Sequence, residues 1–170
     1  MSEVKVYADK LPIKTYLLEE PDPNPFFVEY LGMPNFYPYP LKNRVAKEAR
    51  DVLYNVYCLE NEYFRLTVLP DLGGKLYACY DKRCGRDIFY RNPVIKPQMV
   101  GTTGAWTSGG VEFNYPNRGH RPSAVDYTDT VMQQYGDGSA AIIISEVDRI
   151  SWLRFSVELR LYPGRAYIEQ

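Results

Sequence analysis

Apolar and polar residues alternate with a period of two over most of the chain beyond residue 50. Three such runs are separated by short segments rich in turn-forming residues: Val52–Leu59, Tyr63–Leu69 and Lys75–Tyr80. Alternation is typical of strands that bury one face, and closely spaced short strands are typical of antiparallel sandwiches and barrels. The pattern therefore predicts an all-β fold, and within that class an antiparallel β-sandwich.

The same alternation continues toward the C-terminus and includes a hairpin. Tyr127–Tyr135 and Ser139–Val147 flank Gly136-Asp137-Gly138, which supplies the positive φ angles that a tight connection needs. Trp152–Tyr162 follows, and Ala166–Gln170 begins a further strand pattern with which the sequence ends. Because a sheet needs its next strand, we expect the 170 residues to be the first part of a larger β domain. Pairing at an edge or across a dimer is the alternative.

The first 50 residues have a different character. They divide the chain into an N-terminal strand with an arm (residues 1–50) and a β-sandwich domain (residues 51–170) that we expect to be truncated at its C-terminus. Val4–Leu18 alternates as a strand does, with a break at Pro12. Phe26–Pro40 is rich in proline and aromatic residues, which predicts an irregular arm that lies over the domain or contacts another subunit. Leu41–Arg50 is the one stretch with the character of a short helix.

The segment Trp106–Pro122 carries the most varied chemistry in the chain. It holds an indole, a Gly-Gly pair, a carboxylate, carboxamides, guanidinium groups and the chain's only histidine, His120. Flat aromatic faces with a few fixed donors and acceptors are what a hydroxyl-rich ligand requires. The segment therefore predicts a sugar pocket, although glycine, proline and asparagine also mark an ordinary loop.

Within this segment the alternation assigns side chains to faces. Glu112 and Asn114 lie two positions apart on a predicted strand and so point the same way, while Val111 and Phe113 point toward the core. The imidazole of His120 can act as an acid or as a hydrogen-bond donor near neutral pH. We predict Glu112 and His120 as the catalytic pair and Asn114 as a substrate-binding residue. A solvated surface strand and a loop histidine held by a carbonyl group are the competing interpretation.

The other predicted substrate-binding residues are Trp106, Arg91, Asn92 and Arg121. Trp106 can stack on a pyranose ring or simply pack. Arg91 and Asn92 end a strand before Pro93, where loops gather at the mouth of a sandwich. There they can hold a sugar hydroxyl or carboxylate, or satisfy nearby carbonyl groups. Arg121 follows His120 directly.

Composition narrows the class of function. The net charge is −1 and Lys and Arg are scattered among Asp and Glu, so the basic stripe that nucleic-acid binding needs is absent. No apolar run is long enough for a membrane span or a secretory signal, and we expect a cytoplasmic protein. Three cysteines and one histidine lack metal-ligand spacing, so we expect neither a metal nor a cofactor. Sixteen tyrosines favour a β protein and provide stacking faces with a polar tip.

A resemblance rests on three motifs: Leu69-Pro-Asp-Leu-Gly-Gly-Lys-Leu76, Asp87-Ile-Phe-Tyr-Arg-Asn-Pro-Val94 and Gly104-Ala-Trp-Thr-Ser-Gly-Gly-Val-Glu-Phe-Asn-Tyr-Pro116. Together they resemble an uncharacterised β-sandwich domain family that often precedes tetratricopeptide repeats in bacterial proteins. That family is similar to the galactose mutarotase-like (aldose 1-epimerase) superfamily. The resemblance covers residues 51–170 and implies the N-terminal part of a β-supersandwich with a sugar cleft across a concave sheet.

The resemblance also implies an acid–base chemistry. Mutarotases open the pyranose ring when a carboxylate removes the anomeric hydroxyl proton and a histidine protonates the ring oxygen. Their general base comes from later in a longer domain and a second histidine lies in the cleft, and neither has a counterpart in this sequence. We therefore expect a carbohydrate-binding domain. The alternatives are an active carbohydrate epimerase with Glu112 as base and His120 as acid, and a non-catalytic interaction module. In the module, the aromatic arm docks a partner or a second copy. Separately, a homodimer or a C-terminal half supplied by another chain is a further expectation for the partners.

Overall fold

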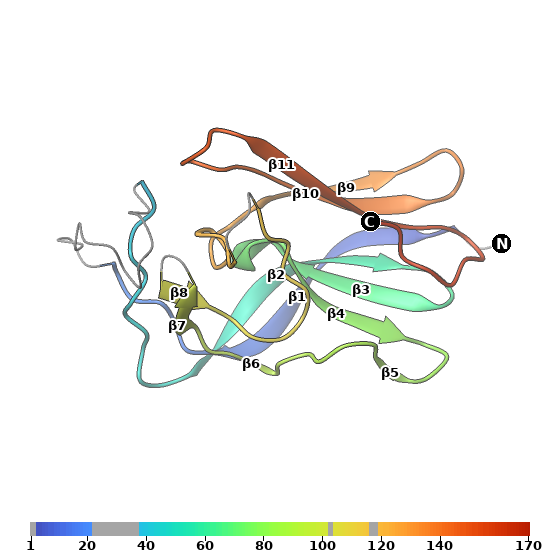
Figure 1. Cartoon of the computed structure of the whole chain (residues 1–170). Coiled ribbons are helices and arrows are strands. Elements are labelled where there is room, and N and C mark those ends of the chain that lie inside the picture. The colour runs from blue at the N-terminus through green and yellow to red at the C-terminus, as the bar shows by residue number, and fades with distance from the viewer. Residues whose placement is uncertain (1–2, 22–37, 102–103, 116–118) are drawn as a thin grey trace.

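The structure is a computed structural model that describes residues 3–21, 38–101, 104–115 and 119–170 (Figure 1). These residues form strands and one short 3-10 helix, η1 (Pro70–Leu72), and hold no α-helix. The strands are β1 (Lys5–Thr15), β2 (Arg50–Glu60), β3 (Phe64–Leu69), β4 (Lys75–Asp81), β5 (Arg86–Asp87), β6 (Val94–Ile95), β7 (Gln98–Gly101), β8 (Gly104–Trp106), β9 (Asp129–Gln134), β10 (Ala140–Val147) and β11 (Arg154–Leu161). The predicted all-β class is confirmed.

The strands form two sheets and a small ribbon. The larger sheet has the order β5-β4-β3-β2-β1-β6, the smaller one has the order β11-β10-β9, and β7 and β8 form the ribbon. Neighbouring strands are antiparallel except β1 and β6, which run parallel where Lys14 and Thr15 pair with Val94 and Ile95. The larger sheet is thus mixed, where the sequence predicted antiparallel pairing throughout. A crossing connection brings β6 beside β1, and a local residue pattern does not reveal such a crossing.

The main core lies between the two sheets. Leu59 and Leu66 of the larger sheet are fully buried against Ile142, Ile144 and Leu159 of the smaller one. Burying side chains of this size stabilises the fold by about 1.5–3 kcal/mol each. The alternating apolar positions that predicted the strands therefore form the contact between the sheets.

The larger sheet is curled, as the length of the link between its edge strands β5 and β6 indicates. In a flat sheet these two edge strands would lie about 24 Å apart, because five spacings of about 4.8 Å separate them. The link from Asp87 to Val94 reaches about 25 Å only when it is fully extended and straight. Figure 1 shows the link following a winding path below the sheet. A second buried cluster, with Ile13, Tyr54 and Ile95, fills part of the face that the curl encloses.

A β-bulge interrupts the pairing of β3 with β4. Thr67 pairs with Ala78 and Val68 pairs with Leu76, so Tyr77 is an extra residue on β4. Leu76 faces the core between the sheets, whereas Tyr77 and Ala78 both belong to the cluster on the opposite face. A bulge re-aims the side chains beside it. Here it turns two successive residues of β4 toward the enclosed face.

β1 continues through Pro12, where the sequence predicted a break. Pro12 pairs with Leu53 of β2, and in the described part of the chain β6 flanks β1 only at Lys14 and Thr15. A proline costs no ladder hydrogen bond when its nitrogen faces the open side of a strand. The predicted strand is present and the predicted break is wrong.

The helical character of Leu41–Arg50 is not expressed. Val45 instead forms an isolated bridge with Leu18, and the backbone bonds beside it run from Ala46 N–H to the Leu17 oxygen (2.8 Å) and from Glu19 N–H to the Arg44 oxygen (3.0 Å). These long-range bonds override a weak helix propensity.

Ala166–Gln170 forms no strand, only a bridge between Glu169 and Arg160. The predicted arm, Phe26–Pro40, lies almost entirely outside the described residues, and the domain division at residue 50 stays a prediction.

Gly73 joins the larger sheet to the segment that follows the predicted site. It has a φ of 67° at the end of η1, and its N–H donates to the carbonyl oxygen of Asp126 (2.7 Å). A Cβ at this position would lie 2.6 Å from the carbonyl oxygen of Ala124 and 2.8 Å from Nη2 of Arg121. Both the left-handed conformation and the close approach require glycine here.

We predict that Gly73→Ala lowers the free energy of unfolding by at least about 2 kcal/mol, because alanine would be strained and would collide with backbone atoms. Gly136→Ala is the matched control. Gly136 has no positive φ, and no atom lies within 4 Å of the place that a Cβ would take in this turn. We expect its effect to stay within about 0.5 kcal/mol. Urea unfolding followed by circular dichroism measures both, and equal effects would contradict the packing described at Gly73.

Candidate functional site

The segment that carries the predicted site is held against β4. Val111 pairs with Leu76 through backbone hydrogen bonds of 2.9 and 3.1 Å. The bridge is isolated, so Glu112 and Asn114 lie on an extended loop, where the sequence predicted a strand. The division of faces agrees with the prediction, since Phe113 is buried in the core and Val111 packs against it.

Glu112 and His120 contact each other directly. Oε1 of Glu112 lies 3.0 Å from Nδ1 of His120. The ring centroid of Trp106 lies 4.9 Å from that of the imidazole, with the ring planes tilted by 38°. The fold therefore brings together three residues that the sequence predicted as parts of one site.

Asn114 joins the same group. Its amide is oriented so that Nδ2 donates to Oε1 of Glu112 (2.5 Å) and to the carbonyl oxygen of Gly119 (3.3 Å), because the opposite orientation would place two oxygens against each other. We call the side chains of Trp106, Glu112, Asn114 and His120 the Glu112 cluster.

Burial differs across the Glu112 cluster. The Glu112 side chain is 12% exposed and that of His120 is 34% exposed. The second carboxylate oxygen of Glu112, Oε2, is buried and accepts no hydrogen bond from the described residues. A buried acceptor without a donor is costly, so this oxygen favours any donor group that can reach it.

Lys75, the first residue of β4, belongs to the site although the sequence did not predict it. It is 2% exposed, and its ammonium group donates to the Thr107 carbonyl oxygen (2.5 Å), to Oγ1 of Thr107 (2.9 Å) and to the Gly109 carbonyl oxygen (3.1 Å). Burial lowers the pKa of Lys75 from 10.5 to about 8, and the charge of Glu112 opposes that shift. Lys75 thus ties the loop that carries Glu112 to the sheet. A lysine that opens a strand usually indicates a solvent-facing position, so the sequence held no signal for it.

Arg121 belongs to the supporting frame. Its guanidinium donates to the carbonyl oxygen of Gly73, lies over the ring of Phe155 (4.9 Å to the centroid) and is buried. Nη1 lies 3.1 Å from Oε2 of Glu146, which is close enough for an ion pair although the two atoms are not aligned for a hydrogen bond. Burial lowers the pKa of Arg121, and the nearby carboxylates oppose that shift. These contacts turn the guanidinium inward, and its predicted role in substrate binding stays untested.

The other two predicted residues, Arg91 and Asn92, have different surroundings. Asn92 donates to Oγ of Ser108 (2.7 Å) and accepts from the N–H of Val94 (3.1 Å), so it holds neighbouring loops together. Arg91 is exposed, and its Nε lies 3.1 Å from Oδ2 of Asp87. Arg91 faces a groove that no local motif predicted.

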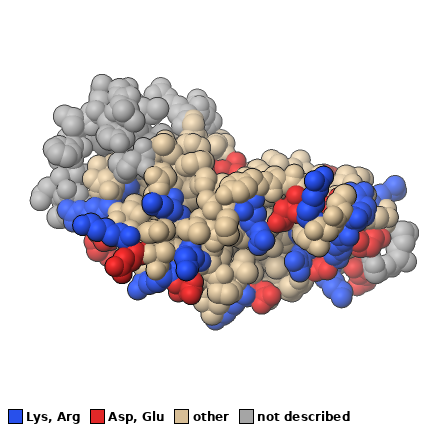
Figure 2. All heavy atoms as spheres, turned by 90° about the horizontal axis from the view of Figure 1, so that it is seen from below, with Lys and Arg blue, Asp and Glu red and all other residues tan. Residues whose placement is uncertain are grey.

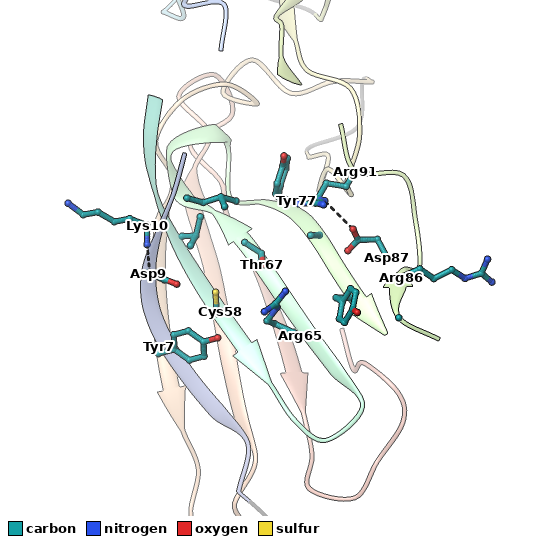
Figure 3. Close-up of a pocket in the computed structure, with 15 residues that line it drawn as sticks. Tyr7, Asp9, Lys10, Cys58, Arg65, Thr67, Tyr77, Arg86, Asp87 and Arg91 are labelled. Atoms are coloured by element: carbon teal, nitrogen blue, oxygen red, sulfur yellow. Dashed lines mark hydrogen bonds and ion pairs between the residues drawn. The ribbon is translucent and has the colours of Figure 1, made fainter. Parts of the chain in front are cut away.

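This groove opens on the face of the larger sheet that points away from the smaller sheet, and it has a volume of about 420 Å³ (Figure 3). Side chains from β1, β2, β3, β4 and the β5 region line it. Its lining includes Tyr7, Arg65, Tyr77, Tyr80, Asp87 and Arg91. We call it the tyrosine groove. A volume of this size suits a small organic ligand.

Hydrogen bonds hold two of the tyrosines in place. The phenol of Tyr7 donates to Oε2 of Glu60 (3.0 Å), and that of Tyr77 donates to the carbonyl oxygen of Asn92 (2.8 Å). Burial raises the pKa of both phenols, so both remain protonated donors at neutral pH. Rings anchored in this way lose little conformational entropy when a ligand stacks on them.

The Glu112 cluster and the tyrosine groove share one face of β4. The antiparallel bridge at Leu76 places Glu112 beside Lys75, and side chains alternate along extended chain. Lys75 and Tyr77 therefore point to the same side, opposite to Leu76 and Val111. The sequence grouped the Glu112 cluster correctly because its members are close in the chain, whereas the groove collects residues from Tyr7 to Arg91. Arg91 is the one predicted site residue that lines the groove, and the many tyrosines were the other hint of it.

Neither a metal-binding group nor a membrane-spanning helix is found among the described residues. They hold no group of three or more His, Cys, Asp or Glu side chains that could bind a metal ion. No helix among them has the length and apolar character needed to cross a membrane. Of the three cysteines, Cys58 and Cys79 are buried free thiols and Cys84 is exposed.

Comparison with known proteins gives a family and a fold. Residues 32–170 match the model of a family described as a domain of unknown function (DUF5107). The chain is also similar in structure to a TPR-domain containing protein from Parabacteroides distasonis ATCC 8503, with a TM-score of 0.82 and 23% sequence identity. The match covers 98% of this chain and 28% of that protein, so the chain spans little more than a quarter of its length. The predicted link to an uncharacterised family and to a tetratricopeptide-repeat protein is confirmed at this level.

We predict that Lys75 makes the free energy of unfolding depend on pH. Comparing the wild type with Lys75→Met isolates this contribution. The pKa of Lys75 is about 8 in the folded chain, below the ordinary value of 10.5, so between these values the unfolded chain binds the proton that the folded chain has released. The free energy of unfolding of the wild type should therefore rise relative to the variant from pH 8 to 10.5, by up to about 3 kcal/mol. Below pH 8 the difference should be constant. Urea unfolding across this range measures it, and a constant difference throughout would mean that folding does not lower this pKa.

Proposed function

We propose that this chain, which belongs to the family described as a domain of unknown function (DUF5107), binds a carbohydrate in the tyrosine groove. The observation that carries the proposal is the combination of anchored tyrosine rings and charged side chains around one open hollow. Sugars present apolar C–H faces and a rim of hydroxyl groups. Such a ligand needs aromatic faces and fixed donors and acceptors in one place.

The lining of the groove meets both needs. Tyr7 and Tyr77 are fixed by their phenol hydrogen bonds, and Tyr80 stands on β4 beyond the bulge. Arg91 and Asp87 form an ion pair at the rim, where each retains hydrogen-bonding capacity toward a hydroxyl group. In Figure 3 the side chains of Tyr7, Tyr77, Arg65 and Arg91 lie around the same space.

The proposal extends to a mutarotase-like architecture. That resemblance implies a sugar cleft across a curved sheet, and a groove on a curled sheet that packs against a second sheet supports this extension. The Glu112 cluster lies on the same side of β4, which would put polar groups next to a sugar bound near Tyr77.

A second candidate function rests on the contact between Glu112 and His120. An acid and a base that act on opposite sides of a sugar cannot touch each other, because the substrate must lie between them. A carboxylate 3.0 Å from Nδ1 acts instead by orienting the imidazole. In an epimerase built on this pair, His120 would transfer the proton and Glu112 would position it.

For the binding function, we predict saturable binding in titration calorimetry with a panel of mono- and oligosaccharides. Tyr80→Ala should weaken binding about tenfold, because the variant removes one stacking face. Tyr127→Ala is the matched control, since Tyr127 is 63% exposed and does not line the groove. Circular dichroism establishes that each variant is folded. Absence of binding to the whole panel by folded wild-type protein would remove the proposal.

For the catalytic alternative, we predict the pattern of rates in an NMR assay of sugar anomerisation. His120→Asn should lower the rate by about a hundredfold or more, and Glu112→Gln should lower it less, because the glutamine side chain can still orient the ring. Rates that are the same for the wild type and both variants would exclude this pair as catalytic residues.

A further inference from the structure

We infer that the tyrosine groove selects a sugar that carries an acidic group, and that Arg65 receives that group. The inference rests on the proposed function, because it names the class of carbohydrate for the same groove. It follows from the balance of charge in the groove, from the direction of each charged side chain and from the contacts of Arg65.

The groove has a positive charge that the chain as a whole lacks. Its lining contains Lys10, Arg65, Arg86 and Arg91 against Asp9 and Asp87, whereas the whole chain has a net charge of −1. The face of the molecule seen in Figure 2 shows cationic and anionic side chains interleaved. The lining therefore differs in the sign of its charge from the chain as a whole.

The directions of these side chains leave one cationic residue to account for the positive charge inside the groove. Lys10 and Arg86 extend away from the hollow in Figure 3, whereas Arg65 rises into it from the middle of the sheet. Arg91 also faces the hollow, but Asp87 neutralises it at 3.1 Å. Among the described residues, Arg65 is thus the inward cation of this groove without a carboxylate within ion-pair distance.

The neighbours of Arg65 leave its donors to a ligand. Arg65 of β3 pairs with Glu60 of β2 on one side and with Tyr80 of β4 on the other. Glu60 is engaged elsewhere, by Nζ of Lys82 (2.7 Å) and by the phenol of Tyr7 (3.0 Å). The guanidinium of Arg65 lies 5.5 Å from the centroid of the Tyr80 ring, which supports it without using its N–H groups.

A guanidinium presented in this way matches an oxyanion. Its parallel N–H groups form two hydrogen bonds to one carboxylate or phosphate, and these charge-assisted bonds are stronger than those to a hydroxyl group. With a neutral sugar bound, these two N–H groups of Arg65 would stay hydrogen-bonded to water. A uronate or a phosphorylated sugar would place its acidic group against Arg65 and its ring against Tyr80 and Tyr7.

The test compares matched acidic and neutral sugars by titration calorimetry. Galacturonate is paired with galactose, glucuronate with glucose, and galactose 6-phosphate separates a phosphate from a carboxylate. Acetate and inorganic phosphate test whether an anion binds without a sugar ring. We expect at least one acidic sugar to bind about tenfold or more tightly than its neutral partner, and the preference to shrink at high salt.

Variants assign the preference to one residue. Arg65→Gln should bring the acidic sugar to the affinity of its neutral partner, and Arg65→Lys, which keeps the charge but loses the paired donors, should fall between. Arg86→Gln removes the same charge from a side chain that points away and should change affinity by less than about twofold. Arg65 is exposed, so we expect each variant to fold, and circular dichroism checks this.

The outcomes separate this inference from the proposed function. Equal binding of acidic and neutral sugars would overturn the inference and leave carbohydrate binding intact, whereas no binding of any sugar would remove both. Acetate or phosphate binding as tightly as the acidic sugars would reduce the groove to an anion site. A preference that survives Arg65→Gln and disappears in Arg86→Gln would show that the assignment to Arg65 is wrong.

Discussion

The contact on which the rest of the site depends is that between the guanidinium of Arg121 and the backbone at Gly73. Removing a guanidinium from water is expensive, and its burial is tolerated only when carbonyl and carboxylate groups replace the lost hydration. Gly73 provides the carbonyl group and Glu146 the carboxylate, one from the turn before β4 and the other from β10. Arg121 therefore links the two sheets through one planar group. His120 precedes it in the chain, so this contact fixes the backbone next to the imidazole, whose ring contacts Glu112 and Trp106.

The parts of the fold that could be predicted from the sequence are those with local causes. β3 and the hairpin of β9 and β10 follow from alternation and from turn residues between the runs. The Glu112 cluster could be grouped because its members lie within fifteen residues of one another. Its geometry could be foreseen only in part, since a single bridge, and no strand, holds the loop at Val111.

What could not be predicted depends on contacts between distant residues. The role of Arg121 is set by Gly73 and Glu146, which lie 48 positions before it and 25 after it. Lys75 has the sequence signature of an exposed residue, and its burial follows from the carbonyl groups of a loop more than thirty positions away. The bulge on β4 had the largest consequence for the groove. Strict alternation would put Tyr77 and Ala78 on opposite faces, and that pattern conceals the wall of the groove.

β4 connects the Glu112 cluster and the tyrosine groove, because its side chains donate hydrogen bonds to backbone carbonyl groups of the loop at each region. Lys75 holds the loop that leads to Glu112 by donating to backbone carbonyl groups, and Tyr77 holds the crossing segment at Asn92 in the same way. Both anchors stand on the same side of one strand, two residues apart. A ligand that stacks on Tyr77 would therefore rest on a strand whose position is already set by both loops. Binding it would cost little further backbone entropy of the protein. For this reason we regard the groove and the Glu112 cluster as adjoining parts of one surface.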